Sequence, residues 1–198
     1  KEFSMGVTGN QLYPTQHVFK YPKAGEDNAK VSLHTYNLKA RKSKKIALGS
    51  YEYIPRIQWS NTNPILIATT LNRHQNDLKL HKVNALKSST SLLLNEKDDA
   101  YVSVKNDLTF LDDNSFIWTS EKDGYNHIYH YDFNGKLINQ ITNGNWEVTK
   151  YYGFNKDKKT IYYQSVESGA INRGVYSIRL NGTNKKLLSN NAGTNTAA

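Results

Sequence analysis

A turn asparagine recurs four times at nearly constant spacing along this chain of 198 residues. It follows the strand-like segments of VSLHTYNL, LKLHKVNA, IYHYDFNG and VYSIRLNG and falls at Asn37, Asn84, Asn134 and Asn181, which lie 47, 50 and 47 residues apart. Further apolar stretches flank each of these segments. A period of about 40 to 50 residues with several short strands per repeat indicates a β-propeller, in which each blade buries its faces against its neighbours.

Alternation of side chains supports strands rather than helices. In the segment 127–133, Ile128 and His130 fall on one face while Tyr129 and Tyr131 fall on the other. This period of two is typical of a β-strand. The chain also contains 14 tyrosines and 12% aromatic residues overall, which suit pleated, half-buried strands. We therefore expect an all-β chain.

The repeat divides the chain into about four four-stranded antiparallel blades that together form a partial propeller over residues 1–190. Turn pairs such as Asn63-Pro64 separate the strands. A polar stretch at 23–28 makes the first blade the least regular, and residues 191–198 show no pattern, which predicts a loop or frayed tail. The approximate blade ranges are 1–50, 51–97, 98–143 and 144–190.

Four blades lie at the lower end of the range for a closed ring, so we interpret the chain as a piece of a larger propeller. The end blades of such a piece would present apolar faces that have no neighbour. This predicts a homo-oligomer that covers those faces. The residues expected on them are Phe3, Val18 and Phe19 at one end and Ile161, Tyr163, Val175 and Ile178 at the other.

Composition excludes several classes of protein. The net charge is +9, but the basic residues at 39–45 sit at a predicted hairpin turn without interleaved aromatic residues, so no nucleic-acid partner is expected. The absence of cysteine excludes disulfides and thiolate metal sites. No run of about 18 apolar residues occurs, so no membrane span is expected. Any export signal would precede Lys1.

No pattern indicates a metal or a cofactor. His127 and His130 lie three residues apart on one strand, so they point to opposite faces and cannot share a metal. The chain has no glycine-rich nucleotide-binding motif. Asp123-Gly124 is interpreted as a turn, since a calcium loop needs more oxygen ligands. Trp118 and Trp146 are interpreted as blade core.

Four segments carry a family resemblance. YPKAGEDN from Tyr21, LNRHQN from Leu71, FIWTSEKDGYNHIYHYD from Phe116 and GNWEV from Gly144 resemble the N-terminal propeller of bacterial dipeptidyl peptidase IV, in the prolyl oligopeptidase group of serine peptidases. The resemblance extends to about Ser189. It implies an eight-bladed propeller stacked on an α/β-hydrolase domain, of which this chain covers roughly the second half. It also implies a periplasmic, secreted or cell-surface location.

The catalytic machinery of that family is not encoded in these residues. Acyl transfer by an α/β-hydrolase needs a serine in a G-x-S-x-G elbow, and none of the 12 glycines has that spacing around a serine. By resemblance, the Ser-Asp-His triad belongs to a hydrolase domain that follows Ala198, and the glutamates that bind the substrate amino terminus precede Lys1. We expect no catalytic residue here and no activity from this chain alone.

The resemblance predicts a function for the chain as the non-catalytic propeller portion of a dipeptidyl aminopeptidase. The whole enzyme would remove Xaa-Pro or Xaa-Ala dipeptides from peptide amino termini, while the propeller shields and gates the active site. By position, Val104 and Lys105 in YVSVKNDLTF would form part of the cavity wall; an ordinary inner strand and loop is the alternative interpretation of that segment. The alternative function is a stand-alone TolB-like propeller that binds a protein partner.

Overall fold

The computed structural model describes residues 1–61, 64–190 and 192–197, and every regular element in these ranges is a β-strand. This confirms the predicted all-β class. The chain divides into two compact units, Lys1–Val31 and Ser32–Ala198. The turn predicted at Asn63 lies outside the described residues. In the described ranges no helix is long and apolar enough to cross a membrane.

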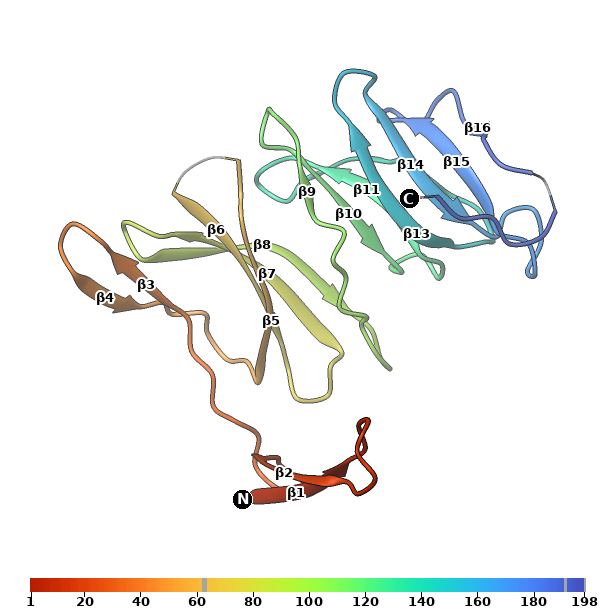
Figure 1. The fold of residues 1–198 in the computed structure, drawn as a ribbon. Coiled ribbons are helices and arrows are strands. Elements are labelled where there is room, and N and C mark those ends of the chain that lie inside the picture. Colours follow the sequence, from red (N-terminus) through yellow and green to blue (C-terminus); the bar gives the residue numbers. More distant parts are fainter. Residues whose placement is uncertain (62–63, 191, 198) are drawn as a thin grey trace. The chain divides into compact units, whose positions relative to one another are not determined.

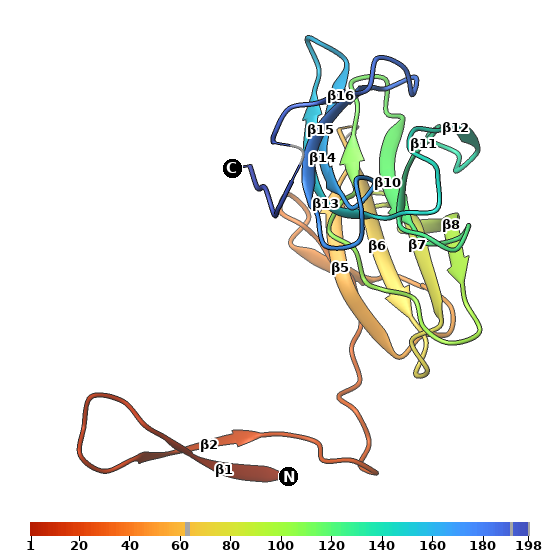
Figure 2. The same ribbon diagram turned by 90° about the vertical axis from the view of Figure 1, so that its right-hand side faces the viewer.

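The first unit is an antiparallel hairpin of β1 (Glu2–Val7) and β2 (Thr15–Lys20). Figure 2 shows it as a narrow ribbon with a wide connecting loop. The Phe3 ring packs against the rings of Phe19 and Tyr21, with centroids 5.8 and 6.0 Å apart. No side chain of residues 1–31 is buried. This unit therefore has aromatic contacts but no closed core.

The second unit contains one two-stranded sheet and three four-stranded sheets, all antiparallel between neighbours. Figure 1 shows the four sheets following one another in chain order. The two-stranded sheet pairs β3 (His34–Asn37) with β4 (Lys42–Lys45). The four-stranded sheets are β5 (Tyr53–Trp59), β6 (Ile65–Leu71), β7 (Asp77–Asn84) and β8 (Ser89–Lys97); β9 (Thr109–Phe110), β10 (Phe116–Ser120), β11 (His127–Tyr131) and β12 (Leu137–Gln140); and β13 (Val148–Asn155), β14 (Thr160–Ser165), β15 (Gly174–Arg179) and β16 (Lys186–Leu187).

The turn asparagine marks the third strand of each four-stranded sheet. Strands β7, β11 and β15 precede or contain Asn84, Asn134 and Asn181, and each pairs with both of its sequence neighbours. These sheets confirm the predicted partial propeller, and they fall within the predicted ranges 51–97, 98–143 and 144–190; the division of the chain into domains at those boundaries stays a prediction.

Residues 1–49 differ from the expected fourth blade. They form two separate hairpins, β1–β2 and β3–β4, which belong to different units, instead of one four-stranded sheet. The polar stretch at 23–28 lies between them. No residue of the first hairpin is buried. Leu33, Ile46 and Leu48, which flank the second hairpin, pack against Leu66 and Val83 of the neighbouring sheet.

Alternating side chains connect each four-stranded sheet to the next. From β10 and β11, Phe116, Trp118 and Tyr129 face the β5–β8 sheet, whereas Ile117 and Ile128 face the β13–β16 sheet. A strand with a period of two can bury both faces only between two neighbours. The middle sheet therefore packs as an interior blade of a propeller packs. Trp118 is buried, as predicted, while Trp146 is half-buried in the turn before β13, against His127.

The apolar residues predicted to be uncovered at the C-terminal end are buried. Ile161, Tyr163 and Ile178 belong to the core between the last two sheets, and Val175 is also buried. The prediction of an exposed face built from these residues is therefore wrong. Ile161 and Tyr163 alternate with Tyr162 and Gln164, which point to the other face, and Val175 lies on that other face because it pairs with Gln164. The alternation alone does not say which face has the neighbour.

The described part of the C-terminal tail, residues 192–197, is attached to the last sheet. The amide of Arg173 donates to the carbonyl of Gly193 at 2.9 Å, and the amide of Asn195 donates back to the carbonyl of Arg173 at 2.8 Å. The amide of Ala197 donates to the hydroxyl of Tyr152 at 3.0 Å. These bonds hold residues 192–197 against the last sheet; the prediction of a loop or frayed tail for residues 191–198 stays a prediction.

Candidate functional site

The segment 98–108 leaves β8 and enters β9 without forming a strand. Its start is fixed because the Asp98 carboxylate accepts hydrogen bonds from the amides of Ala100 and Tyr101, at 2.7 and 3.2 Å. The amide of Val102 donates to the carbonyl of Gln75 at 2.9 Å. Val102 and Leu108 enter the core between the first two four-stranded sheets. The segment is therefore an ordered loop held at both ends.

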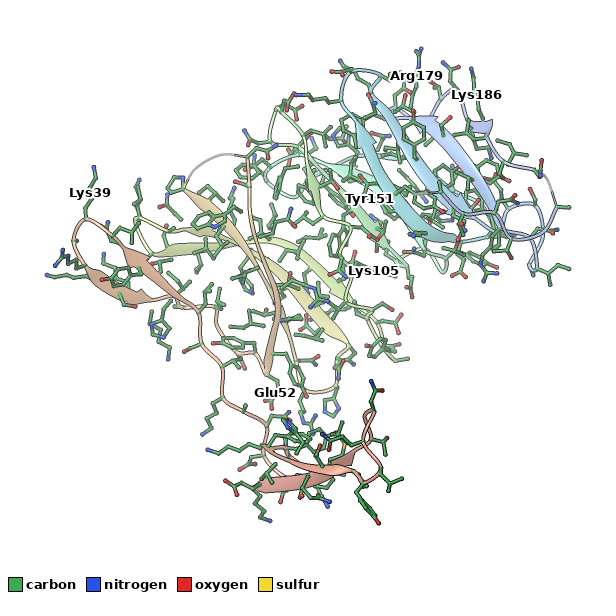
Figure 3. The ribbon with its side chains drawn as sticks, viewed as in Figure 1. Lys39, Glu52, Lys105, Tyr151, Arg179 and Lys186 are labelled. Carbon is green, nitrogen blue, oxygen red and sulfur yellow. The ribbon has the colours of Figure 1, made fainter. Side chains whose placement is uncertain are left out.

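The two predicted wall residues lie on different sides of this segment. Val104 is partly buried and packs against the core. Lys105, labelled in Figure 3, lines a cavity. Its ammonium lies 2.7 Å from the Glu121 carboxylate. The structure thus brings Lys105, but not Val104, to a concave surface. The role of either residue in a substrate cavity stays a prediction.

The cavity has a volume of about 330 Å³ and lies between two neighbouring sheets of the second unit. Its apolar lining includes Leu94, Val102 and Leu137, and its polar lining is rich in charged residues. The charged side chains are Glu96, Lys97, Asp98, Lys105, Glu121 and Lys122. This lining is more strongly charged than the mostly apolar lining of a typical small-molecule site, which favours a charged ligand.

Glu96, on β8, is the most desolvated acid of the lining. The indole Nε1 of Trp118 donates to its carboxylate at 3.0 Å, and Ser120 also forms a hydrogen bond with it. Burial raises the pKa of Glu96, although these hydrogen bonds and nearby lysines oppose the rise. The carboxylate is therefore held in a fixed position at a partly dry surface.

Lys122 lies in the turn between β10 and β11. Its ammonium donates to the hydroxyl of Tyr131 at 2.8 Å and lies 4.0 Å from the ring centroid of Tyr129. Burial lowers the pKa of Lys122, with Glu96 opposing the decrease. Burial also raises the pKa of Tyr131. Sequence reasoning missed Glu96 and Lys122, because no spacing rule connects residues that meet only when two sheets pack.

His127 and His130 contact different partners on opposite faces of their strand. His127 contacts the hydroxyl of Thr142 at 3.1 Å and donates through Nε2 to the carbonyl of Gly144 at 3.0 Å. His130 contacts the hydroxyl of Ser115 at 2.8 Å on the other face. Within residues 1–61, 64–190 and 192–197, no three His, Asp or Glu side chains gather closely enough to hold a metal ion.

Ser115 has an acid and a histidine beside it but lacks the arrangement of a nucleophile. Its hydroxyl donates to Asp113 at 2.5 Å and lies 2.8 Å from His130 Nε2. In a catalytic triad the histidine stands between the acid and the serine, whereas here the serine stands between the other two. Ser115 is also only 4% exposed. The trio is a polar contact within one sheet, in which Ser115 and His130 are buried and Asp113 is exposed.

Comparison with known proteins gives a family match over almost the whole chain. The model of the family described as "Dipeptidyl peptidase IV (DPP IV) N-terminal region" matches residues 2–198. A probable dipeptidyl-aminopeptidase B from Phaeosphaeria nodorum is 25% identical over 206 residues, which cover 93% of this chain and 22% of that protein.

Two solved structures are similar over the full length of the chain or nearly so. The crystal structure of Porphyromonas gingivalis dipeptidyl peptidase 4 matches with a TM-score of 0.88 and 42% identity, covering 100% of this chain and 28% of that one. A putative dipeptidyl aminopeptidase IV from Bacteroides ovatus matches with a TM-score of 0.74 and 26% identity, covering 96% and 30%. The chain thus spans less than a third of the length of these relatives.

Proposed function

Since the chain belongs to the family of dipeptidyl peptidase IV N-terminal regions, we propose that it is the non-catalytic propeller portion of a dipeptidyl aminopeptidase. One observation carries this proposal. The chain is 42% identical over its whole length to a dipeptidyl peptidase 4 of known structure, yet it contains no G-x-S-x-G elbow. A portion that lacks the nucleophile contributes enclosure and access rather than bond cleavage.

In this proposal the catalytic serine, aspartate and histidine lie in a C-terminal α/β-hydrolase domain of the same polypeptide. The whole enzyme removes Xaa-Pro or Xaa-Ala dipeptides from peptide amino termini, in a periplasmic, secreted or cell-surface location and without a cofactor. The stacked sheets exclude folded proteins from the active site and admit narrow, extended peptides. We also propose that the whole enzyme forms a homo-oligomer.

Segment 98–108 supports a contribution to the substrate cavity. It is an ordered loop that presents Lys105 to a concave surface, with the ammonium paired to Glu121 at 2.7 Å. A charged side chain held in one position can orient an extended peptide at little cost in conformational entropy. Val104 acts behind it by packing against the core, which fixes the path of the segment.

Two measurements test the proposal. The 198-residue chain alone should release no chromophore from Gly-Pro-p-nitroanilide, and a fluorophosphonate that labels activated serines should leave it unmodified. The coding sequence after Ala198 should contain a G-x-S-x-G elbow followed by an aspartate and a histidine. Stoichiometric labelling of a serine in this chain would contradict the first expectation. A stop codon or further blades alone would instead favour a stand-alone, TolB-like scaffold that binds a protein partner.

A further inference from the structure

Most charged side chains around the cavity are already neutralised. Lys105 pairs with Glu121 at 2.7 Å, and Lys97 lies 3.7 Å from Asp77. Asp98 is satisfied by two backbone amides. Among the described residues, Glu96 and Lys122 line the same cavity but form no ion pair. One acid and one amine therefore face this space without a direct ion pair.

Ser120 lies between Glu96 and Lys122. The hydroxyl of Ser120 accepts a hydrogen bond from the backbone amide of Lys122 at 3.2 Å and also contacts the Glu96 carboxylate. Both groups line the same cavity, yet their charged atoms lie beyond ion-pair distance. Each of the two charges shifts the pKa of the other toward its ionised form. A gap of this kind between opposite charges leaves room for a ligand.

Both groups keep hydrogen-bonding capacity that the protein does not use. The Lys122 ammonium has three donors and gives one to Tyr131. The Glu96 carboxylate has about four acceptor positions, of which Trp118 and Ser120 occupy two. A partly desolvated charge gains more from an opposite charge than a solvated one does.

We propose that this cavity binds a small zwitterion, namely a free α-amino acid or a dipeptide, with its ammonium on Glu96 and its carboxylate on Lys122. The volume of about 330 Å³ is at the lower end of the range for small-molecule sites, which suits a ligand of this size. Leu94, Val102 and Leu137 provide an apolar surface for the ligand side chain. A purely cationic or purely anionic ligand would leave one protein charge unpaired.

The proposal rests on the charges of the cavity and not on the peptidase assignment. A binding experiment with this chain measures no hydrolysis, so its outcome is independent of whether a hydrolase domain follows Ala198. Binding of a dipeptide to the isolated chain would also be separate from the family's capture of a substrate amino terminus, which the resemblance assigns to residues before Lys1.

The test is calorimetric titration of the 198-residue chain near neutral pH with three related ligands. Gly-Leu carries both charges, N-acetyl-Gly-Leu lacks the ammonium, and Gly-Leu amide lacks the carboxylate. Gly-Leu should bind with a stoichiometry of one, and each derivative should bind at least about tenfold more weakly, since a hydrogen bond to a charged group contributes about 1.5 to 3 kcal/mol. No saturable binding of Gly-Leu, or equal binding of all three ligands, overturns the proposal.

Two variants test which protein side chain binds the ammonium of the ligand and which binds its carboxylate. Glu96→Gln should remove the preference for Gly-Leu over its acetylated form, and Lys122→Met should remove the preference over the amide. Glu147→Gln and Lys87→Met are matched controls, because both side chains are exposed and lie outside the cavity lining. A variant that loses binding of all three ligands equally has only a structural role. If a variant fails to fold, the ligand series on the unmodified chain still decides the question.

Discussion

The first unit and the three four-stranded sheets have similar strand patterns but different burial. In β6, six of seven residues are buried, whereas β2 has no buried residue although it contains Val18 and Phe19. Both strands carry apolar side chains, and both pair antiparallel. Within its own unit β6 has other sheets to pack against, whereas the first unit contains the β1–β2 sheet alone. Alternation thus predicts a strand, while burial depends on what packs against its faces.

The β3–β4 hairpin lies between these extremes. Leu33, Ile46 and Leu48 are buried against the β5–β8 sheet, but Tyr36 is 59% exposed and every residue of β4 is exposed. A two-stranded sheet can therefore bury the end that meets a neighbour and leave its remainder in solvent. It is stabilised by packing at one end only.

Removal of an aromatic ring should give the largest difference in stability between the first unit and the four-stranded sheets. Phe116→Ala should cost about 3 to 5 kcal/mol, because Phe116 is fully buried and stacks on Tyr131 at 5.3 Å. Phe3→Ala removes a ring of the first unit. Urea unfolding followed by tryptophan fluorescence reports the second unit, which contains all three tryptophans. The midpoint should fall for Phe116→Ala and stay unchanged for Phe3→Ala; equal shifts would contradict the separation into two units.

A methyl group added at one glycine of each unit separates two costs, that of side-chain packing and that of backbone conformation. Gly135 has φ of +81° and Gly25 has φ of +84°, so both substitutions pay the cost of a left-handed conformation, about 1 to 2 kcal/mol. A Cβ at Gly135 would meet the carbonyl oxygen of Leu93, on β8 of the neighbouring sheet, at 1.8 Å. A Cβ at Gly25 would meet no atom within 4 Å.

Gly135→Ala should therefore lower the stability of the second unit by about 2 to 4 kcal/mol in the same urea assay. Gly25→Ala should leave that transition unchanged. If Gly135→Ala costs no more than a left-handed alanine in open space, then the turn that contains Gly135 and β8 are not in close contact.

Mild acid should weaken the four-stranded sheets through their buried histidines. Burial lowers the pKa of both His81 and His130, with Lys79 adding to the decrease at His81, while Asn139 and Asp113 oppose it at His130. A histidine whose pKa is lower in the folded state contributes stability above its unfolded pKa of about 6.5. That stability is lost as pH falls from 6.5 through the folded values.

The urea midpoint should accordingly decrease between about pH 7.5 and pH 5.5, a window above the titration of ordinary carboxylates. The double substitution His81→Gln and His130→Gln should flatten this decrease even if it lowers stability at every pH. An unchanged slope in the double variant would show that other groups cause the acid sensitivity.

Much of the fold could be predicted from local pattern, because turn asparagines and alternation are short-range features. The period around Asn84, Asn134 and Asn181 identified the third strand of each complete sheet. The same period around Asn37 predicted a four-stranded sheet that the structure does not form. Sequence contains no direct signal of which strands find a partner, since pairing depends on residues distant along the chain.

The candidate site was less predictable for the same reason. Lys105 was identified by resemblance and does line a cavity, whereas its neighbour Val104 packs into the core. Glu96 and Lys122 are 26 residues apart and reach the same space from adjacent sheets. The Trp118 indole that holds Glu96 was predicted only as core. Contacts across a sheet interface cannot be read from spacing within one strand.

The exposed β4 strand has a consequence for how the chain behaves at high concentration. It pairs only with β3, so one row of its backbone amides and carbonyls has no partner in a sheet. An open edge of this kind invites pairing with other molecules, and lysines on the edge oppose it by electrostatic repulsion. Lys42, Lys44 and Lys45 occupy three of its four positions. Acetylation of these side chains would remove that repulsion and favour aggregation of otherwise folded protein.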